Sequence, residues 1–230
     1  MKPTIQDVEI VAPAKEWEKI RVDPRFLELM RLARITNSLS LAYGPLLHTL
    51  ADQTPQARRD RFAAFFFSAA VLKEGLDTAQ SLGRWYHNLP QFKEGFGAIL
   101  KDAASSALHT ELLKKVRNEL VFHFDREAIA EGLSHFPAGD ARIATYPASG
   151  PVSGDIYVDV ADDAILGYLF GSARTEREYL ERLEDFMFQV SKLFKEFMKA
   201  AHRLLAVGFV ELGCRKRMMD RPAGLSDEAG

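Results

Sequence analysis

Cysteine is almost absent from this chain, because Cys214 is the single one among 230 residues. One cysteine excludes an internal disulfide framework and is typical of a reducing compartment. Long apolar runs are absent as well. The longest, residues 62–72, is interrupted by Ser68 and is much shorter than the roughly 18 residues that a membrane span needs. Residues 1–11 lack the apolar core of a signal peptide. We therefore expect a cytoplasmic protein that makes no membrane contact.

An excess of positive charge is also missing. The chain has 30 basic and 32 acidic residues, which gives a net charge of −2. No global field would attract nucleic acid, so any contact with RNA would depend on a local patch. Hydrophobic residues make up 47% of the chain and charged residues 27%, which is usual for a globular protein. The composition and length predict one folded domain over residues 1–210.

Three helix starts can be recognised from local side-chain chemistry. Asp23-Pro24 and Thr54-Pro55 each place a capping side chain before a proline at the first helical position. Thr175 and Glu178 form a capping box at the start of the longest predicted helix, which continues at helical period to about residue 205. A further long helix is predicted over 104–124, with Asp125 capping a shorter one that ends near Gly132.

The hydrophobic period changes in the middle of the chain. Residues 141–146 and 155–160 are short β-branched runs separated by a segment rich in proline, glycine and serine. This pattern predicts a β-hairpin over about 141–160. Residues 211–230 are predicted to be a flexible C-terminal tail. The expected fold is mainly α: an up-and-down helical bundle with a small β-hairpin insertion.

One segment has residue types that suggest a reaction. Arg117-Asn118 is followed, after four further residues, by His123. This spacing resembles the ribonuclease motif of the HEPN superfamily. The resemblance implies a helical bundle and a metal-independent endoribonuclease without a cofactor, which acts as a toxin or phage-defence effector. Arg117 and His123 would then be catalytic and Asn118 would bind substrate. The implied partners are RNA, a second copy in a homodimer, and an antitoxin or regulatory protein.

The proposed chemistry suits these side chains. Cleavage of RNA through its own 2′-hydroxyl needs a group that transfers protons near neutral pH, as histidine does. It also needs charge and hydrogen-bond donors at the phosphate, which arginine supplies. On a continuous helix, Arg117 and His123 would be about 120° apart around the axis and about 9 Å apart along it. One chain would place them poorly around one phosphate, unless the helix breaks between them or a dimer pairs two motifs.

A structural role for these residues is the main alternative. The predicted helix has an apolar face, with His109 and His123 within it and Arg117 at its edge. A histidine in that position is often a hydrogen-bonded core residue, and an arginine often packs its stem over apolar neighbours. The chain would then be a non-catalytic interaction protein of the same fold. Asp125 also occupies the place where one branch of the superfamily has a tyrosine, so regulation through that tyrosine is not expected.

Other possible sites are weaker. Glu119 and His123 lie one helical turn apart, as metal ligands can, but no second such pair accompanies them. Glu74 and Asp77 could place carboxylates in a cleft, although a solvated face is the default for such residues. A small-molecule site is a third alternative, formed by four aromatic residues: Phe65, Phe66, Trp85 and Tyr86.

Overall fold

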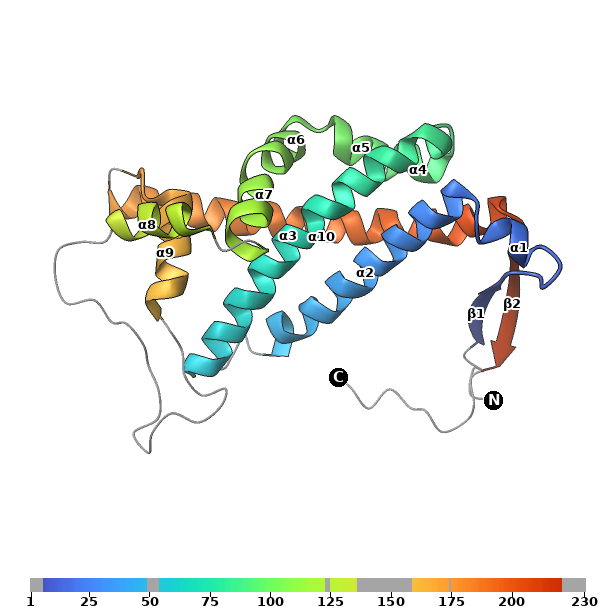
Figure 1. Ribbon diagram of the computed structural model, residues 1–230, viewed down its shortest axis with the longest axis horizontal. Coiled ribbons are helices and arrows are strands. Elements are labelled where there is room, and N and C mark those ends of the chain that lie inside the picture. The colour runs from blue at the N-terminus through green and yellow to red at the C-terminus, as the bar shows by residue number, and fades with distance from the viewer. Residues whose placement is uncertain (1–5, 49–53, 123–124, 136–158, 174, 221–230) are drawn as a thin grey trace.

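The computed structural model describes residues 6–48, 54–122, 125–135, 159–173 and 175–220. Over these ranges the protein is mainly helical, with one small antiparallel sheet (Figure 1). The longest helices are α2 (Pro24–His48), α3 (Pro55–Tyr86) and α10 (Glu176–Glu211). The shorter helices are α1 (Trp17–Ile20), α4 (Pro90–Glu94), α5 (Phe96–Lys101), α6 (Ala103–Thr110), α7 (Leu112–Lys115), the π-helix η1 (Val116–Val121), α8 (Arg126–Ser134) and α9 (Asp159–Phe170).

The starts of α3 and α10 agree with their predicted caps. The Thr54 hydroxyl accepts from the Ala57 amide at 3.2 Å, and the Thr175 hydroxyl accepts from the Glu178 amide at 3.1 Å. Each bond satisfies one of the amides that a helix start leaves unpaired. The start of α2 at Pro24 is also as predicted, although Asp23 bonds to the Arg25 backbone and guanidinium.

Aromatic side chains align α10 against the α2–α3 pair. Phe186 lies 5.7 Å from Phe65 near the start of α3, whereas Phe209 lies 5.9 Å from Phe26 near the start of α2. Because α2 and α3 are antiparallel (Figure 1), α10 runs in the direction of α3 and opposite to α2. The core lies between these three helices.

At the other end of α3, helices α4 and α5 complete the core. The Phe96 ring is 5.3 Å from the Phe197 ring, and both side chains are fully buried. Gly75 makes room for Phe197, because a β-carbon at Gly75 would overlap the ring. None of the described helices is both long enough and apolar enough to cross a membrane.

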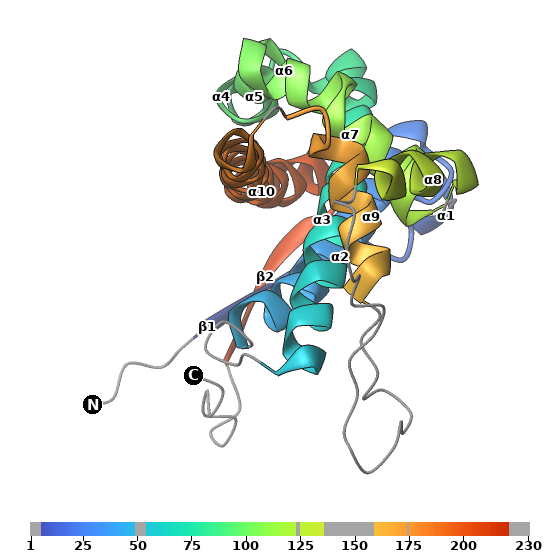
Figure 2. The ribbon, with the colours of Figure 1, turned by 90° about the vertical axis from the view of Figure 1, so that its left-hand side faces the viewer.

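The described sheet is not the predicted hairpin. Strand β1 (Gln6–Val11) pairs antiparallel with β2 (Arg215–Asp220), so the sheet joins two segments from opposite ends of the sequence. It lies below α1 in Figure 1 and extends away from the helices in Figure 2. The strand β2 corrects the prediction of a flexible tail over 211–230 for residues 215–220, because these residues gain a partner that only the tertiary fold provides, while residues 221–230 lie outside the described residues. Most of the predicted hairpin, 136–158, lies outside the described residues, while Asp159 and Val160 begin α9.

Candidate functional site

The segment that carries Arg117 is not one continuous helix. The prediction of one helix over 104–124 is wrong in this respect. Helix α6 ends at Thr110, and Glu111 separates it from α7, which continues directly into the π-helix η1. Leu113, Val116 and Leu120 are nevertheless buried on one side. The apolar pattern is therefore kept through the irregular backbone, which explains why it predicted a regular helix. Short π-helical turns are rare and are frequent at functional sites.

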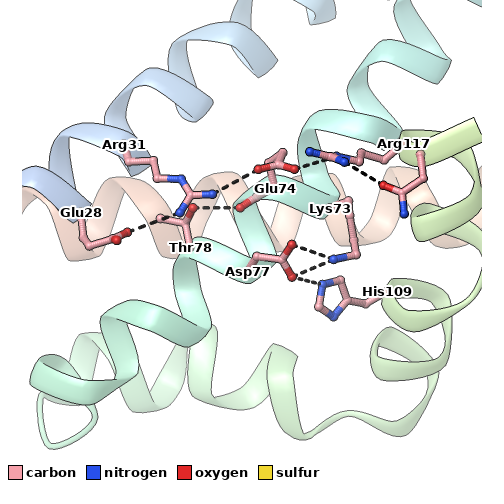
Figure 3. Close-up of polar contacts among 9 residues, drawn as sticks. Glu28, Arg31, Lys73, Glu74, Asp77, Thr78, His109 and Arg117 are labelled. Atoms are coloured by element: carbon pink, nitrogen blue, oxygen red, sulfur yellow. Dashed lines mark hydrogen bonds and ion pairs between the residues drawn. The ribbon is translucent and has the colours of Figure 1, made fainter. Parts of the chain in front are cut away.

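Arg117 lies on η1 and reaches α3 (Figure 3). Its Nε donates to Glu74 Oε1 at 2.8 Å, and its Nη1 donates to Asn118 Oδ1 at 2.8 Å. The guanidinium also lies 5.8 Å from the centre of the Phe122 ring. With its side chain 35% exposed, Arg117 remains accessible from solvent. The structure thus brings Arg117 and Asn118 together, whereas His123 lies outside the described residues.

Glu74 is shared between two arginines. Its Oε2 accepts from Arg31 Nη2 of α2 at 3.1 Å, while its Oε1 accepts from Arg117. The carboxylate therefore joins α2, α3 and η1 and offsets part of the positive charge around Arg117. The sequence marked Glu74 as a possible cleft carboxylate. It could not reveal the two partners of Glu74, because each lies 43 residues away along the chain.

A second ionic cluster lies one turn further along α3 (Figure 3). Asp77 accepts from Lys73 Nζ at 2.7 Å and from His109 Nε2 at 3.0 Å. Burial lowers the pKa of His109, with a further contribution from Lys73, while Asp77 opposes both effects. The His109 side chain is only 8% exposed. This geometry agrees with the structural role that the sequence indicated for His109 and shows that Asp77 is its partner.

The opposite side of η1 faces α9. The Tyr168 hydroxyl donates to Glu119 Oε2, and Lys115 Nζ lies 5.1 Å from the centre of the Tyr168 ring. The Glu119 carboxylate, followed by burial, raises the pKa of Tyr168 to about 12. Tyr168 was not recognised from the sequence, because no local signal links residues 49 positions apart.

Asp125 has the role that the sequence predicted. Its Oδ1 accepts from the Ala128 amide at 2.9 Å and caps α8. Its own amide donates to the Glu119 carbonyl at 2.6 Å, which fixes the point where the chain leaves η1.

No group of three or more metal-binding side chains occurs in the part of the chain that the structure describes. Glu119, considered above as a possible metal ligand, is instead bonded to Tyr168.

The four aromatic residues of the small-molecule alternative do not line one space. Phe65 and Phe66 lie about 30 Å from Trp85 and Tyr86 along α3, at 1.5 Å per residue. A cavity of about 450 Å³ lies elsewhere, between α4–α5 and α10. Its lining combines charged residues such as Glu94, Lys192 and Arg203 with apolar ones such as Ile99.

No family model matches this chain, and no curated protein or solved structure matches it either.

Proposed function

We propose that this protein is a metal-independent endoribonuclease of HEPN type, acting in the cytoplasm as a toxin or phage-defence effector. The observation that carries the proposal is the position of Arg117 and Asn118, which contact each other on a π-helix that ends at Val121. The helix therefore ends before His123, and the separation of about 120° and 9 Å expected on a continuous α-helix no longer applies.

In this function Arg117 binds and neutralises the phosphate, Asn118 orients the substrate, and His123 transfers protons. Arg117 uses its Nε and Nη1 groups within the protein, and an arginine has five N–H donors in a rigid fork. A partly exposed guanidinium that is fixed through two of its nitrogens is pre-oriented, and its Nη2 group can donate to a phosphate. Glu74 would compete with that phosphate, so substrate binding would shift Arg117 from the carboxylate towards RNA.

The proposal includes a homodimer in which the two motifs share a cleft. It also includes an antitoxin or regulatory protein, because an unrestrained ribonuclease would damage the cell that makes it. RNA binding relies on the local charges of Arg117 and its neighbours, since the net charge of the chain is −2.

The test is cleavage of labelled single-stranded RNA in the presence of EDTA. Arg117→Ala and His123→Ala are each expected to reduce the cleavage rate by about 100-fold or more, as expected for loss of phosphate stabilisation or of proton transfer. Arg25→Ala is the matched control for Arg117, because Arg25 is an arginine of similar exposure (40%) in an ion pair with Asp23. His87→Ala removes an exposed histidine. Circular dichroism verifies that each variant folds.

Cleavage that persists in both folded variants would reject the assignment of Arg117 and His123. A wild-type protein that cleaves none of a diverse set of RNAs would reject the ribonuclease itself.

A non-catalytic interaction protein is the second candidate, and one observation favours it: Arg117 is already bonded to Glu74 and Asn118. In that function the arginine ties η1 to α3 and performs no chemistry. The variant Glu74→Gln distinguishes the ribonuclease from the interaction protein. An ion pair at this exposure contributes roughly 0–1 kcal/mol, so stability should change little in either case. Affinity for RNA should increase in Glu74→Gln only if the protein is the ribonuclease, because the carboxylate that competes with the phosphate is then removed.

A further inference from the structure

The π-helix is held by contacts on two opposite sides. On one side Arg117 bonds to Glu74 of α3, and on the other Glu119 accepts from Tyr168 of α9. A π-helix is a rare local conformation that is frequent at functional sites. These two contacts involve residues only two positions apart on η1, so together they restrict both its rotation and its position.

The backbone and the side chain of Glu119 are both connected to the pair of helices α8 and α9. Its carbonyl accepts from the amide of Asp125, which also caps α8. Helix α8 crosses α9 at Gly132 and Gly167, where a β-carbon on either glycine would overlap backbone atoms of the other helix. Helix α9 then returns Tyr168 to the Glu119 carboxylate. Both the backbone and the side chain of Glu119 are therefore fixed by the same pair of helices.

We propose that Tyr168, acting through Glu119, is a positioning residue for the Arg117–Asn118 segment. Tyr168 holds Glu119, whose carbonyl accepts from the Asp125 amide, and so fixes η1 relative to the start of α8. The significance for catalysis rests on the proposed function, whereas the effect on the conformation of η1 does not.

The hydroxyl of Tyr168 is the part that matters. Tyr168→Phe removes the donor and retains the ring over which Lys115 lies. Glu119→Gln keeps an oxygen acceptor for that donor, whereas Glu119→Ala removes the acceptor. Tyr86→Phe is the matched control, because the buried Tyr86 hydroxyl has no hydrogen-bond partner among the described residues.

Two readouts are measured on each full-length variant. Hydrogen exchange of the Asp125 amide reports its bond to the Glu119 carbonyl, and RNA cleavage gives kcat and KM. A hydrogen bond to a carboxylate is typically strong enough that Tyr168→Phe should accelerate Asp125 exchange by about tenfold or more. It should also lower kcat by about tenfold and change KM by less than about twofold, because misplacement of catalytic groups affects the chemical step most.

The pattern across variants decides the proposal. Glu119→Ala should change Asp125 exchange and kcat as much as Tyr168→Phe does. The double variant Tyr168→Phe/Glu119→Ala should show changes no larger than either single variant, and Glu119→Gln should remain close to wild type. Asp125 exchange in Tyr168→Phe equal to that in Tyr86→Phe would overturn the positioning role. Faster exchange with unchanged kcat would overturn its importance for the reaction.

A protein that is not a ribonuclease and a Tyr168 that does not position η1 give different results. If the wild type cleaves no RNA, the ribonuclease is rejected and Tyr168 has no reaction to position for. Asp125 exchange then still decides whether Tyr168 fixes η1. If the wild type cleaves RNA and Arg117→Ala abolishes cleavage, an unchanged Tyr168→Phe rejects the positioning role alone.

Discussion

Two sides of α3 are packed in different ways. On the side of Gly75, the fully buried rings of Phe96 and Phe197 fill the space between α3, α5 and α10. On the side of Glu74, η1 is bonded to α3 by an ion pair, and η1, α8 and α9 meet through hydrogen bonds and close contacts between glycines. The first region is held by side-chain volume, and the second depends on specific polar geometry.

This difference indicates where stability and where function are expected to concentrate. Burial of large apolar side chains gives the larger free energy but tolerates many arrangements. Hydrogen-bonded contacts contribute less free energy each and fix distances and orientations more strictly. Arg117 lies in the second kind of region, which is the arrangement that a catalytic or recognition site requires.

The largest predicted effect is on the aromatic region. Phe197→Ala should lower the free energy of unfolding by about 3–5 kcal/mol, because it removes a fully buried ring and leaves a cavity. Urea unfolding followed by circular dichroism measures the change. Phe188→Ala on the same helix is the control, since Phe188 is 68% exposed and its loss should cost less than about 0.5 kcal/mol.

A double-mutant cycle sharpens this prediction. Gly75→Ala should be destabilising in the wild type, where the new methyl group overlaps Phe197, and nearly neutral in Phe197→Ala. Equal costs in both backgrounds would show that the two residues do not share the space described above.

A smaller and more local effect is predicted for the polar region. Gly132→Ala should lower stability by about 1–3 kcal/mol, because the added methyl group forces α8 and α9 apart. Hydrogen exchange should accelerate in α8 and α9 and remain slow in the central turns of α3 and α10. Uniform acceleration across all helices would contradict the separation of the molecule into two regions.

The smallest effect concerns His109. Burial lowers its pKa below the usual 6.5 in the folded protein, so the unfolded chain binds a proton more readily. The His109 contribution to stability is therefore complete above pH 6.5 and decreases as the pH falls towards the lowered pKa. Urea unfolding between pH 7.5 and 5 should show a smaller loss of stability for His109→Gln than for the wild type. An equal loss of stability in the two proteins would contradict this contribution of His109.

Features set by neighbouring residues could be predicted from the sequence. The caps at Thr54, Asp125 and Thr175 each bond to an amide three residues away, so their chemistry is visible in a short stretch of sequence. The long helices α3 and α10 were predicted for the same reason, because their apolar residues recur at helical period.

Features set by distant residues could not be predicted. Arg117 and Glu74 are 43 positions apart, Glu119 and Tyr168 are 49 apart, and β1 finds its partner at the other end of the described chain. The π-helix was missed because it keeps Val116 and Leu120 on the buried side, as an α-helix would. The catalytic pairing of Arg117 with His123 stays a prediction.

The pairing of β1 with β2 has a consequence for synthesis. Val11 lies opposite Arg215, so β1 leaves the ribosome long before β2 and has no partner until β2 is made. At roughly 5–20 residues per second, that wait is on the order of 10–40 seconds. An unpaired strand is a site of unwanted association, and β1 carries two acidic residues, Asp7 and Glu9, that oppose pairing with a second copy of itself.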